Sequence, residues 1–371
     1  MKTNNCLPAV LEIDSNKLSS NLKKIKSMIQ KSEILAMLKG NAYGIGLENV
    51  ASILIREGIK FFGVVGIVEA TSLRTLSKKI TILNFEPIME EKIESLLKKK
   101  ICPIIYKPED ISILAKSDLF YKQGTSVYLK VNTGLNRWGL SIKEAVSVAE
   151  ELSKFTKVTI CGLITTLIED KVEDVKQINT IEKLQNELKK RGITIPQISY
   201  ASSQYILSTS DKKSNLTRLG ISLCGVYPDN ETQKNEIVKL DQVFNLKTHI
   251  SQTRIIKANE SVLYKKRLVV NRSMKIGILP IGYYLGLSPL LKNQGSVLIN
   301  NQFCPILGIS MSSTVVDITR VKKIISNQEV ILLGQQGGKR ISIYDWERWT
   351  GISRYVLMSG LSYLLPRKYI G

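Results

Sequence analysis

The sequence has few of the residues that most often bind metal ions or transfer protons near neutral pH. Its 371 residues include one histidine, His249, which excludes a site with several histidine ligands and argues against histidine acid–base chemistry. The five cysteines are far apart and form no CxxC pair, as is typical of reduced thiols in a cytoplasmic protein. We therefore expect no metal site.

Long apolar segments are also missing. No apolar run approaches the roughly 20 residues that a membrane-spanning helix needs. The N-terminus, MKTNNCLPAVLEID, lacks the continuous apolar region of a signal peptide. We expect a cytoplasmic protein without a membrane partner.

Acidic residues are scarce relative to basic ones. There are 32 Asp and Glu against 53 Lys and Arg, a net charge of +21. Such a charge is compatible with nucleic-acid binding through phosphate contacts. The lysines are spread over many segments, such as 21–31, 92–100 and 186–192, and no nucleic-acid motif accompanies them. This distribution favours solvated helix faces, so we expect no nucleic-acid partner.

The first two-thirds of the chain alternates short apolar runs with amphipathic segments. The runs cover 33–38, 60–65, 80–85, 102–106, 126–132, 159–165, 197–201 and 218–223. Helical periodicity covers 14–29, 46–58, 67–79, 142–155 and 172–192. Eight strands with helices between them predict a (β/α)8 barrel, an α/β fold.

After about Pro228 the pattern changes to short β runs separated by Asn, Gly, Ser and Pro. This pattern is typical of an all-β domain with hairpins. We therefore predict a barrel domain over 10–235 and a C-terminal β domain over 236–371, with a boundary uncertain by about ten residues.

Several polar residues follow the predicted barrel strands. Lys39 follows the first run, in EILAMLKGNAYGIG, and Arg137 follows the fifth. Ser203 follows the seventh run, and the eighth carries Arg218 with the turn Gly220–Ile221. Barrel active sites lie at the C-terminal ends of the strands, and phosphate often binds after strands 7 and 8. The pattern predicts an organic phosphate beside a nucleophilic amine.

Simpler interpretations of these residues stay open. A lysine at a strand end is often a solvated flank, Arg137 and Arg218 could form ordinary ion pairs, and Ser203 could cap a helix.

From about Pro8 to Tyr369 the chain resembles the pyridoxal-phosphate-dependent alanine racemases of fold-type III. The motifs that carry this resemblance are KGNAYGIG, LKVNTGLNRWGL, TRLGISLCGVY, LPIGY, CPILG followed by VVDIT, and LPRKY. It implies a homodimer with shared active sites that interconverts L- and D-alanine, a small amino-acid substrate, for peptidoglycan synthesis.

The resemblance also implies residue roles. Lys39 would bind the aldehyde of pyridoxal 5′-phosphate and act as the base on one face of the substrate Cα. Arg218 would face the pyridine nitrogen, and Arg137 would contact the phenolic oxygen and orient the substrate carboxylate. Lys130, if carbamylated, would position Arg137. The remaining roles are phosphate binding by Tyr43, Ser203, Tyr355 and the backbone of Gly220 and Ile221, and substrate binding by Met311.

Racemisation needs a second base on the opposite face of Cα, which is a tyrosine in the family. Alignment without gaps from 278–283 places Leu268 there, and a leucine cannot carry a proton. If the segment is one continuous strand, Tyr264 lies about 13 Å from Leu268 on the same face, with Lys266 between them. Thr166 stands where the family has a histidine that stacks on the pyridine ring. Further departures are Ser312 after Met311, and Tyr284 and Leu285 where relatives have alanine and aspartate.

Three functions are therefore compatible with the sequence. The first is an alanine racemase, with a replacement for the second base. The second is a reaction on one face of another amino acid with Lys39 as the only base. The third is a protein that carries the cofactor without catalysis.

Overall fold

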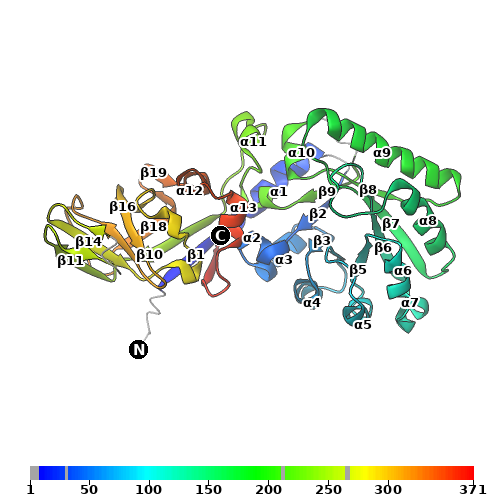
Figure 1. Ribbon diagram of the computed structural model, residues 1–371, viewed down its shortest axis with the longest axis horizontal. Helices are drawn as coiled ribbons and strands as arrows, with labels where there is room; N and C mark the ends of the chain where they lie inside the picture. The colour runs from blue at the N-terminus through cyan, green and yellow to red at the C-terminus, as the bar shows by residue number, and fades with distance from the viewer. Residues whose placement is uncertain (1–7, 30–31, 210–213, 264–267) are drawn as a thin grey trace. The chain divides into compact units, whose positions relative to one another are not determined.

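The computed structural model describes residues 8–29, 32–209, 214–263 and 268–371 (Figure 1). The chain divides into two compact units. The barrel unit comprises residues 19–42 and 47–240, and the β unit comprises residues 1–18, 43–46 and 241–371. Residues 10–18, which we had assigned to the barrel domain, thus group with the C-terminal part of the chain.

The barrel unit contains an eight-stranded sheet in the order β8-β7-β6-β5-β4-β3-β2-β9, with every pair parallel. Its strands are β2 (Glu33–Met37), β3 (Phe61–Val64), β4 (Thr81–Asn84), β5 (Cys102–Ile105), β6 (Thr125–Lys130), β7 (Val158–Ile164), β8 (Gln197–Ser199) and β9 (Leu216–Leu219). All eight predicted strands are confirmed, although the last run continues beyond β9 into a short 3-10 helix, η2 (Ile221–Cys224). Because β9 pairs with β2, the sheet is a nearly closed barrel.

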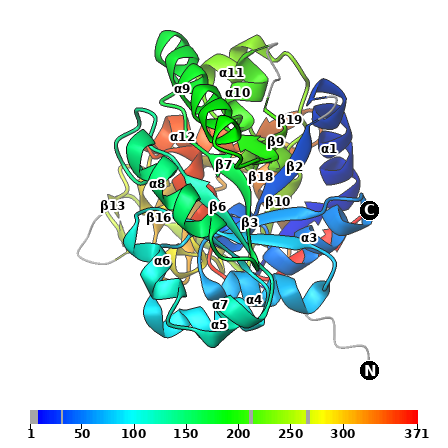
Figure 2. The same cartoon turned by 90° about the vertical axis from the view of Figure 1, so that its right-hand side faces the viewer.

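Helices connect these strands, and Figure 2 shows α4, α5 and α7 outside them. The predicted helices are confirmed as α1 (Ser15–Ile29), α3 (Leu47–Arg56), α4 (Ile67–Leu76), α8 (Ile142–Ser153) and α9 (Lys171–Lys190). The others are α2 (Lys39–Tyr43), η1 (Glu90–Lys92), α5 (Ile93–Lys98), α6 (Glu109–Leu114), α7 (Asp118–Lys122), α10 (Ser203–Ser208) and α11 (Asn230–Asn235). Polar residues cap the N-termini of two of these helices. Ser141 and Glu144 form a capping box at α8, and the Asp170 side chain accepts hydrogen bonds from two backbone N–H groups at α9.

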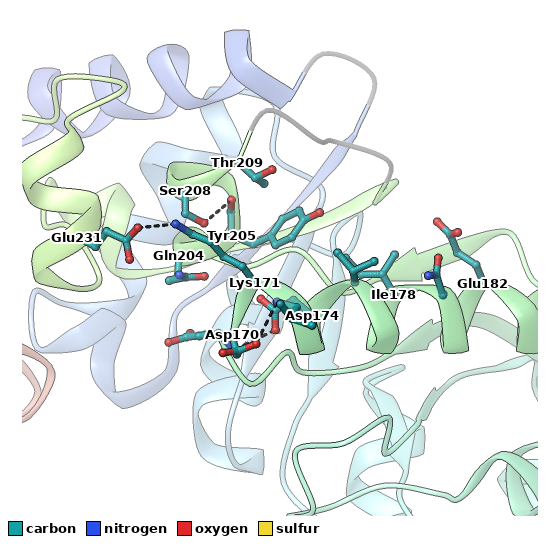
Figure 3. A pocket seen from close by; sticks show the side chains of 14 residues that line it. Asp170, Lys171, Asp174, Ile178, Glu182, Gln204, Tyr205, Ser208, Thr209 and Glu231 are labelled. Carbon is teal, nitrogen blue, oxygen red and sulfur yellow. Dashed lines mark hydrogen bonds and ion pairs between the residues drawn. The ribbon is translucent and has the colours of Figure 1, made fainter.

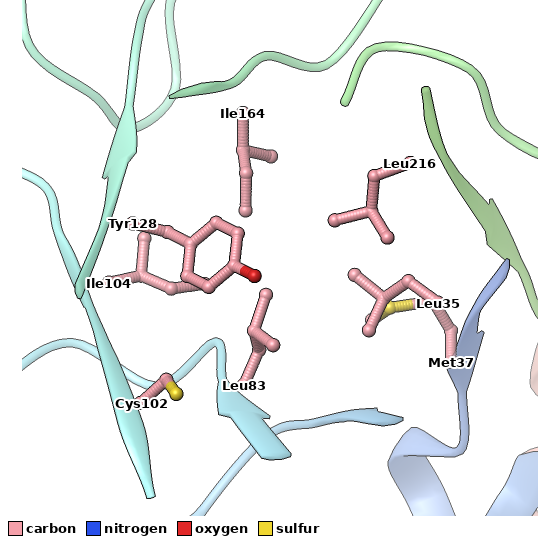
Figure 4. Packing of buried hydrophobic residues seen from close by; sticks show 8 residues of the cluster. All are labelled: Leu35, Met37, Leu83, Cys102, Ile104, Tyr128, Ile164 and Leu216. Atoms are coloured by element: carbon pink, nitrogen blue, oxygen red, sulfur yellow. The ribbon is translucent and has the colours of Figure 1, made fainter. Parts of the chain in front are cut away.

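Apolar side chains from several strands fill the barrel interior. Figure 4 shows Leu35, Met37, Leu83, Cys102, Ile104, Tyr128, Ile164 and Leu216 in one buried cluster. The Tyr128 hydroxyl donates to Gln197 Oε1 at 2.7 Å, so this large ring is accommodated without an unsatisfied polar atom. The interior is therefore a packed core, and chemistry must take place at its ends.

The β unit is built on a ten-stranded, mostly antiparallel sheet. Its strands are β1 (Ala9–Asp14), β10 (Phe244–His249), β11 (Gln252–Ile256), β14 (Met274–Leu279), β15 (Ser296–Ile299), β16 (Gln302–Ile309), β17 (Thr314–Asp317), β18 (Glu329–Gln336), β19 (Lys339–Ile341) and β20 (Arg367–Ile370). The parallel pair is β1 with β20. A separate hairpin joins β12 (Ser261–Val262) to β13 (Leu268–Val269). Short helices are η4 (Tyr283–Leu285), η5 (Pro289–Leu291), α12 (Ile343–Thr350) and α13 (Arg354–Ser359).

No helix in the described part of the chain is both long enough and apolar enough to cross a membrane.

Candidate active site

Lys39 lies directly beyond the C-terminal end of β2, in a turn of unusual backbone conformation. Gly40, Asn41, Ala42 and Tyr43 all have positive φ, between 53° and 64°. Three of these residues have a Cβ, for which a left-handed turn costs about 1–2 kcal/mol each. Such strain persists only where surrounding contacts enforce it, and it is typical of functional sites.

Side-chain hydrogen bonds hold this turn in place. Asn41 N donates to Glu69 Oε1 at 2.8 Å, and Leu47 N donates to Asn41 Oδ1 at 2.8 Å. The Ala42 N–H donates to the Leu38 carbonyl at 2.8 Å. Glu69 was not among the predicted residues, because an acidic residue in the first turn of a helix is explained by the helix dipole alone.

The Lys39 amine lies in a field of positive charge. Its side chain reaches solvent at the end of the barrel, yet removal of water by the surrounding protein lowers its pKa, and the charges of Arg137 and Arg218 lower it further. Lys130, at the end of β6, is buried, and its pKa lies well below 10.5 for the same reasons, with burial as the largest cause. The structure thus brings together Lys39, Lys130, Arg137 and Arg218, as the sequence predicted.

Arg218 is fixed by hydrogen bonds to neighbouring strand ends. Its Nη1 donates to the Ser199 carbonyl and to Ser199 Oγ, both at 2.8 Å. Its Nη2 donates to the carbonyls of Thr165 at 2.9 Å and Tyr200 at 3.2 Å. These four acceptors are neutral and give the guanidinium a defined orientation at the strand ends.

Ser203 and Gly220 meet where the last strands end. Gly220 N donates to Ser203 Oγ at 3.2 Å, and the Ser203 and Ser222 hydroxyls share a hydrogen bond of 2.8 Å. Ser202 caps α10, so Ser203 is not the helix cap that we had considered. The backbone N–H of Ile221 follows Gly220, and its side chain is buried. Hydroxyl and backbone N–H donors beside cations suit a phosphate group.

A polar network surrounds Thr166. The Lys130 Nζ donates to Thr166 Oγ1. Gln177 Nε2 donates to the Thr166 carbonyl at 3.1 Å and to Thr133 Oγ1 at 3.0 Å. The Thr133 and Thr165 hydroxyls share a hydrogen bond of 2.7 Å. Gln177 was missed, although a polar residue on the apolar face of 172–192 was a usable signal.

The predicted residues of the β unit have their own arrangement. The Tyr43 and Tyr355 rings lie 6.2 Å apart between centroids, at an angle of 53°. Arg354, which precedes Tyr355, is buried and donates through Nε to Glu347 Oε2 at 2.7 Å. Met311 is 62% exposed.

The residues considered for the second base lie at the β12–β13 pair. Val262 and Leu268 are Cα partners in this antiparallel pair. Tyr264 and Lys266 lie outside the described residues, as does the side chain of Leu268, so the expected separation of Tyr264 from Leu268 stays a prediction.

Figure 3 shows a cavity of about 600 Å³ near the N-terminal end of α9, in the barrel unit. Lys171 and Glu231 form an ion pair of 2.9 Å there. None of the predicted site residues lines this cavity, so it adds nothing to their arrangement.

Comparison with protein families decides the family. The model of the alanine racemase N-terminal domain matches residues 13–228, and that of the C-terminal domain matches 243–369. This chain belongs to the alanine racemase family. The resemblance found in the sequence is thereby confirmed, and the family's cofactor is pyridoxal phosphate.

Individual relatives agree with the family. An alanine racemase of Clostridium perfringens is 30% identical over 98% of this chain and 95% of its own length. One from Borreliella burgdorferi is 30% identical over 96% of each chain. The solved alanine racemase of Clostridium difficile 630 superposes with a TM-score of 0.92 at 25% identity, covering 99% of this chain and 97% of its own. That of Bartonella henselae, solved with covalently bound pyridoxal phosphate, shares the fold with a TM-score of 0.85 at 24% identity, covering 98% of this chain and 99% of its own.

Proposed function

We propose that this protein is a pyridoxal-phosphate-dependent alanine racemase, an isomerase that interconverts L- and D-alanine for peptidoglycan synthesis. The observation that carries the proposal is the Lys39 amine, held by a strained turn among Arg137, Arg218 and Lys130. Full-length similarity to alanine racemases supports the same substrate. We further propose a cytoplasmic homodimer with shared active sites.

The residues present fit this cofactor. The donors at the end of the barrel are cations, a hydroxyl and backbone N–H groups, which suit an anionic group. Arg218 offers a guanidinium that cannot accept a proton, so a pyridine nitrogen facing it stays unprotonated. Ser203, Gly220 and Ile221 would hold the phosphate in the barrel unit. Tyr43 and Tyr355 remain proposed phosphate ligands in the β unit.

Pyridoxal phosphate, when bound, withdraws electrons from the Cα of an amino acid and makes its α-proton acidic. The protein must then supply bases and orientation. Lys39 has a pKa lowered by burial and by Arg137 and Arg218, so its neutral amine is more abundant near pH 7 than that of an exposed lysine. It can take or return the proton on one face of Cα. Arg137 can pair with the substrate carboxylate.

The base on the other face is proposed to come from the connection of the β12–β13 hairpin. Tyr264 carries a hydroxyl that can donate and accept a proton, and Lys266 is the second candidate. Tyr264 is the tyrosine nearest in sequence to Leu268, the aligned position. Leu268 then needs no catalytic role.

Lys130 is proposed to be carbamylated. Its neutral amine can react with carbon dioxide, which forms an N–C bond and releases a proton. The resulting anion would attract Arg137 and Arg218, whereas the protonated amine is repelled by both. The Thr166 hydroxyl contacts this amine and is placed to accept or donate a hydrogen bond in either state.

The proposal is tested by incubating the cofactor-loaded protein with L-alanine in deuterium oxide. We expect exchange of the α-proton together with formation of D-alanine, followed by NMR and a chiral assay. Tyr264→Phe should abolish D-alanine formation while exchange on the Lys39 face continues. The control is Tyr363→Phe, since Tyr363 is 82% exposed and should leave both rates unchanged.

Other outcomes would replace the proposal. Exchange without D-alanine in the unsubstituted protein would indicate one working base and a one-face reaction. No exchange with any small amino acid, in a protein that binds the cofactor, would indicate a carrier.

A further inference from the structure

A second group of cations lies at the opposite end of the same barrel. It surrounds a cavity of about 1130 Å³ beside the N-terminal ends of β4, β5 and β6. The cavity is lined by basic residues from the ends of two helices and the loops that follow them, which are Arg74, Lys78, Lys79, Lys98, Lys99 and Lys100. We call it the basal cavity. The predicted site residues of the barrel unit lie at the other, C-terminal ends of the strands, and none of them lines this cavity.

Arg74 holds the two lysine-bearing loops together. Its Nε donates to the Lys99 carbonyl at 2.9 Å and its Nη2 to the Lys100 carbonyl at 2.8 Å. Its Nη1 donates to the Ile80 carbonyl at 2.8 Å, in the other loop. One guanidinium thus fixes both loops relative to each other before any ligand binds. Such preorganisation reduces the entropy that binding would lose.

The lysine ammonium groups of the basal cavity are not neutralised by the protein. None of the five lysines takes part in an ion pair within the described chain. Glu91 and Glu94 also line the cavity, and Ser117 Oγ donates to Glu94 at 2.6 Å. Cations therefore outnumber carboxylates, so an anion from outside would be attracted to the cavity.

Helix dipoles do not explain this charge. Helices α4 and α5 end beside the cavity, and a basic residue in the last turn complements each C-terminus. Arg74 and Lys98 already meet that need. Lys78, Lys79, Lys99 and Lys100 lie beyond the last helical residues, where the dipole effect fades.

We infer that the basal cavity binds a small ligand carrying two or more linked phosphate groups. A single phosphate would neutralise too few of the five ammonium groups, whereas a chain of phosphates can contact both loops at once. Hydroxyls of Thr81, Ser95 and Ser126 line the cavity and can donate to phosphate oxygens. The volume suits a ligand of nucleotide size. A concave site between clamped loops favours such a ligand over a long nucleic acid.

The inference is tested with inorganic triphosphate as the probe, by calorimetric titration of the cofactor-loaded protein in metal-free buffer. We expect one site per chain. Replacing Lys78, Lys79, Lys98, Lys99 and Lys100 together by Gln should weaken binding at least about tenfold, because these charges contact the probe. The matched control removes the same charge from exposed lysines elsewhere in the barrel unit: Lys26, Lys143, Lys183, Lys189 and Lys190. It should change affinity by about twofold or less, because these lysines are screened.

Further variants separate folding from binding. Replacing the same five lysines by Arg should preserve the affinity for triphosphate. The variant with five Gln residues should keep the far-UV circular dichroism spectrum and the racemase activity of the parent. Equal loss of triphosphate affinity in the basal and control variants would overturn the inference, because the overall charge of the protein alone would then explain the binding. Absence of triphosphate binding would also overturn it, including the case where a 20-nucleotide RNA binds with a steep salt dependence.

Discussion

Lys130 offers the sharpest test of the electrostatics of the barrel site. It is 7% exposed, and its pKa lies well below 10.5, first because burial removes water and then because Arg218 and Arg137 repel its charge. In the unfolded chain the same amine keeps its ordinary pKa. Folding at neutral pH must therefore either release a proton or retain a buried charge. We predict that Lys130→Met stabilises the cofactor-free protein at pH 7.

The direction of the pH dependence follows from proton binding. Between the lowered pKa of the folded state and 10.5, the unfolded chain holds one proton more than the folded chain, so stability rises with pH. Below that window the loss of stability caused by the buried Lys130 charge is constant, and above pH 10.5 it disappears. The slope within the window is about 1.4 kcal/mol per pH unit. Against this gain, Met loses the hydrogen bond to Thr166, worth about 1 kcal/mol.

The assay is urea unfolding of parent and variant between pH 7 and pH 10, in buffer free of bicarbonate. The variant should be more stable at pH 7, and its advantage should shrink as pH rises. Lys143→Met, on the exposed face of α8, controls for the loss of one charge. Bicarbonate should stabilise the parent more than the variant, since the variant lacks the Lys130 amine that would form the carbamate. A variant less stable than the parent at pH 7, with no dependence on pH, would refute this reasoning.

Three further changes test other parts of the site. Lys39→Ala should abolish the absorbance band of the lysine–cofactor link, whereas retention of that band would place the link elsewhere. Glu347→Gln removes a carboxylate partner of the buried Arg354 and should destabilise the protein by about 3 kcal/mol, measured by urea unfolding. Gly282→Ala should cost about 3 kcal/mol or more, because an added Cβ would overlap the backbone of Ser310 and Met311, whereas Gly338→Ala has open space and should change stability by about 0.5 kcal/mol or less.

The barrel was predictable because parallel strands covered by helices read as continuous apolar runs. The first strand, β1, was missed because it belongs to the sheet of the β unit and not to the barrel. Its residues alternate between buried and half-buried, and it pairs with β10 and β20, which lie far away in the sequence. A short alternating run gives no indication of which distant strand completes it. The grouping of residues 10–18 with the β unit follows from that pairing.

The cations of the site were predictable individually, because each follows a strand. Their effect on one another was not. The pKa of Lys39 is lowered first by loss of water around the amine and then by the charges of Arg137 and Arg218, which lie close only in the folded chain. Arg218 is in turn aligned by carbonyls of Thr165, Ser199 and Tyr200. Every residue has a backbone carbonyl, so residue identity does not show which carbonyls accept these hydrogen bonds. The pairing of Val262 with Leu268 is likewise a backbone contact that residue identity does not announce.

The net charge of +21 therefore has at least two different structural settings. At the C-terminal end of the barrel the cations are few, and the pKa values of Lys39 and Lys130 are lowered by burial and then by the charges of Arg137 and Arg218. At the N-terminal end they are lysines of two loops clamped by Arg74, which sequence spacing presents as ordinary helix ends.

Salt should distinguish these two groups of cations. Exposed ammonium groups of the basal cavity are screened within about 10 Å at 0.1 M salt, so triphosphate affinity should fall steeply as salt is added. The buried charges near Lys39 are screened much less, so racemisation should be far less sensitive. Equal sensitivity of both would contradict their assignment to separate ends.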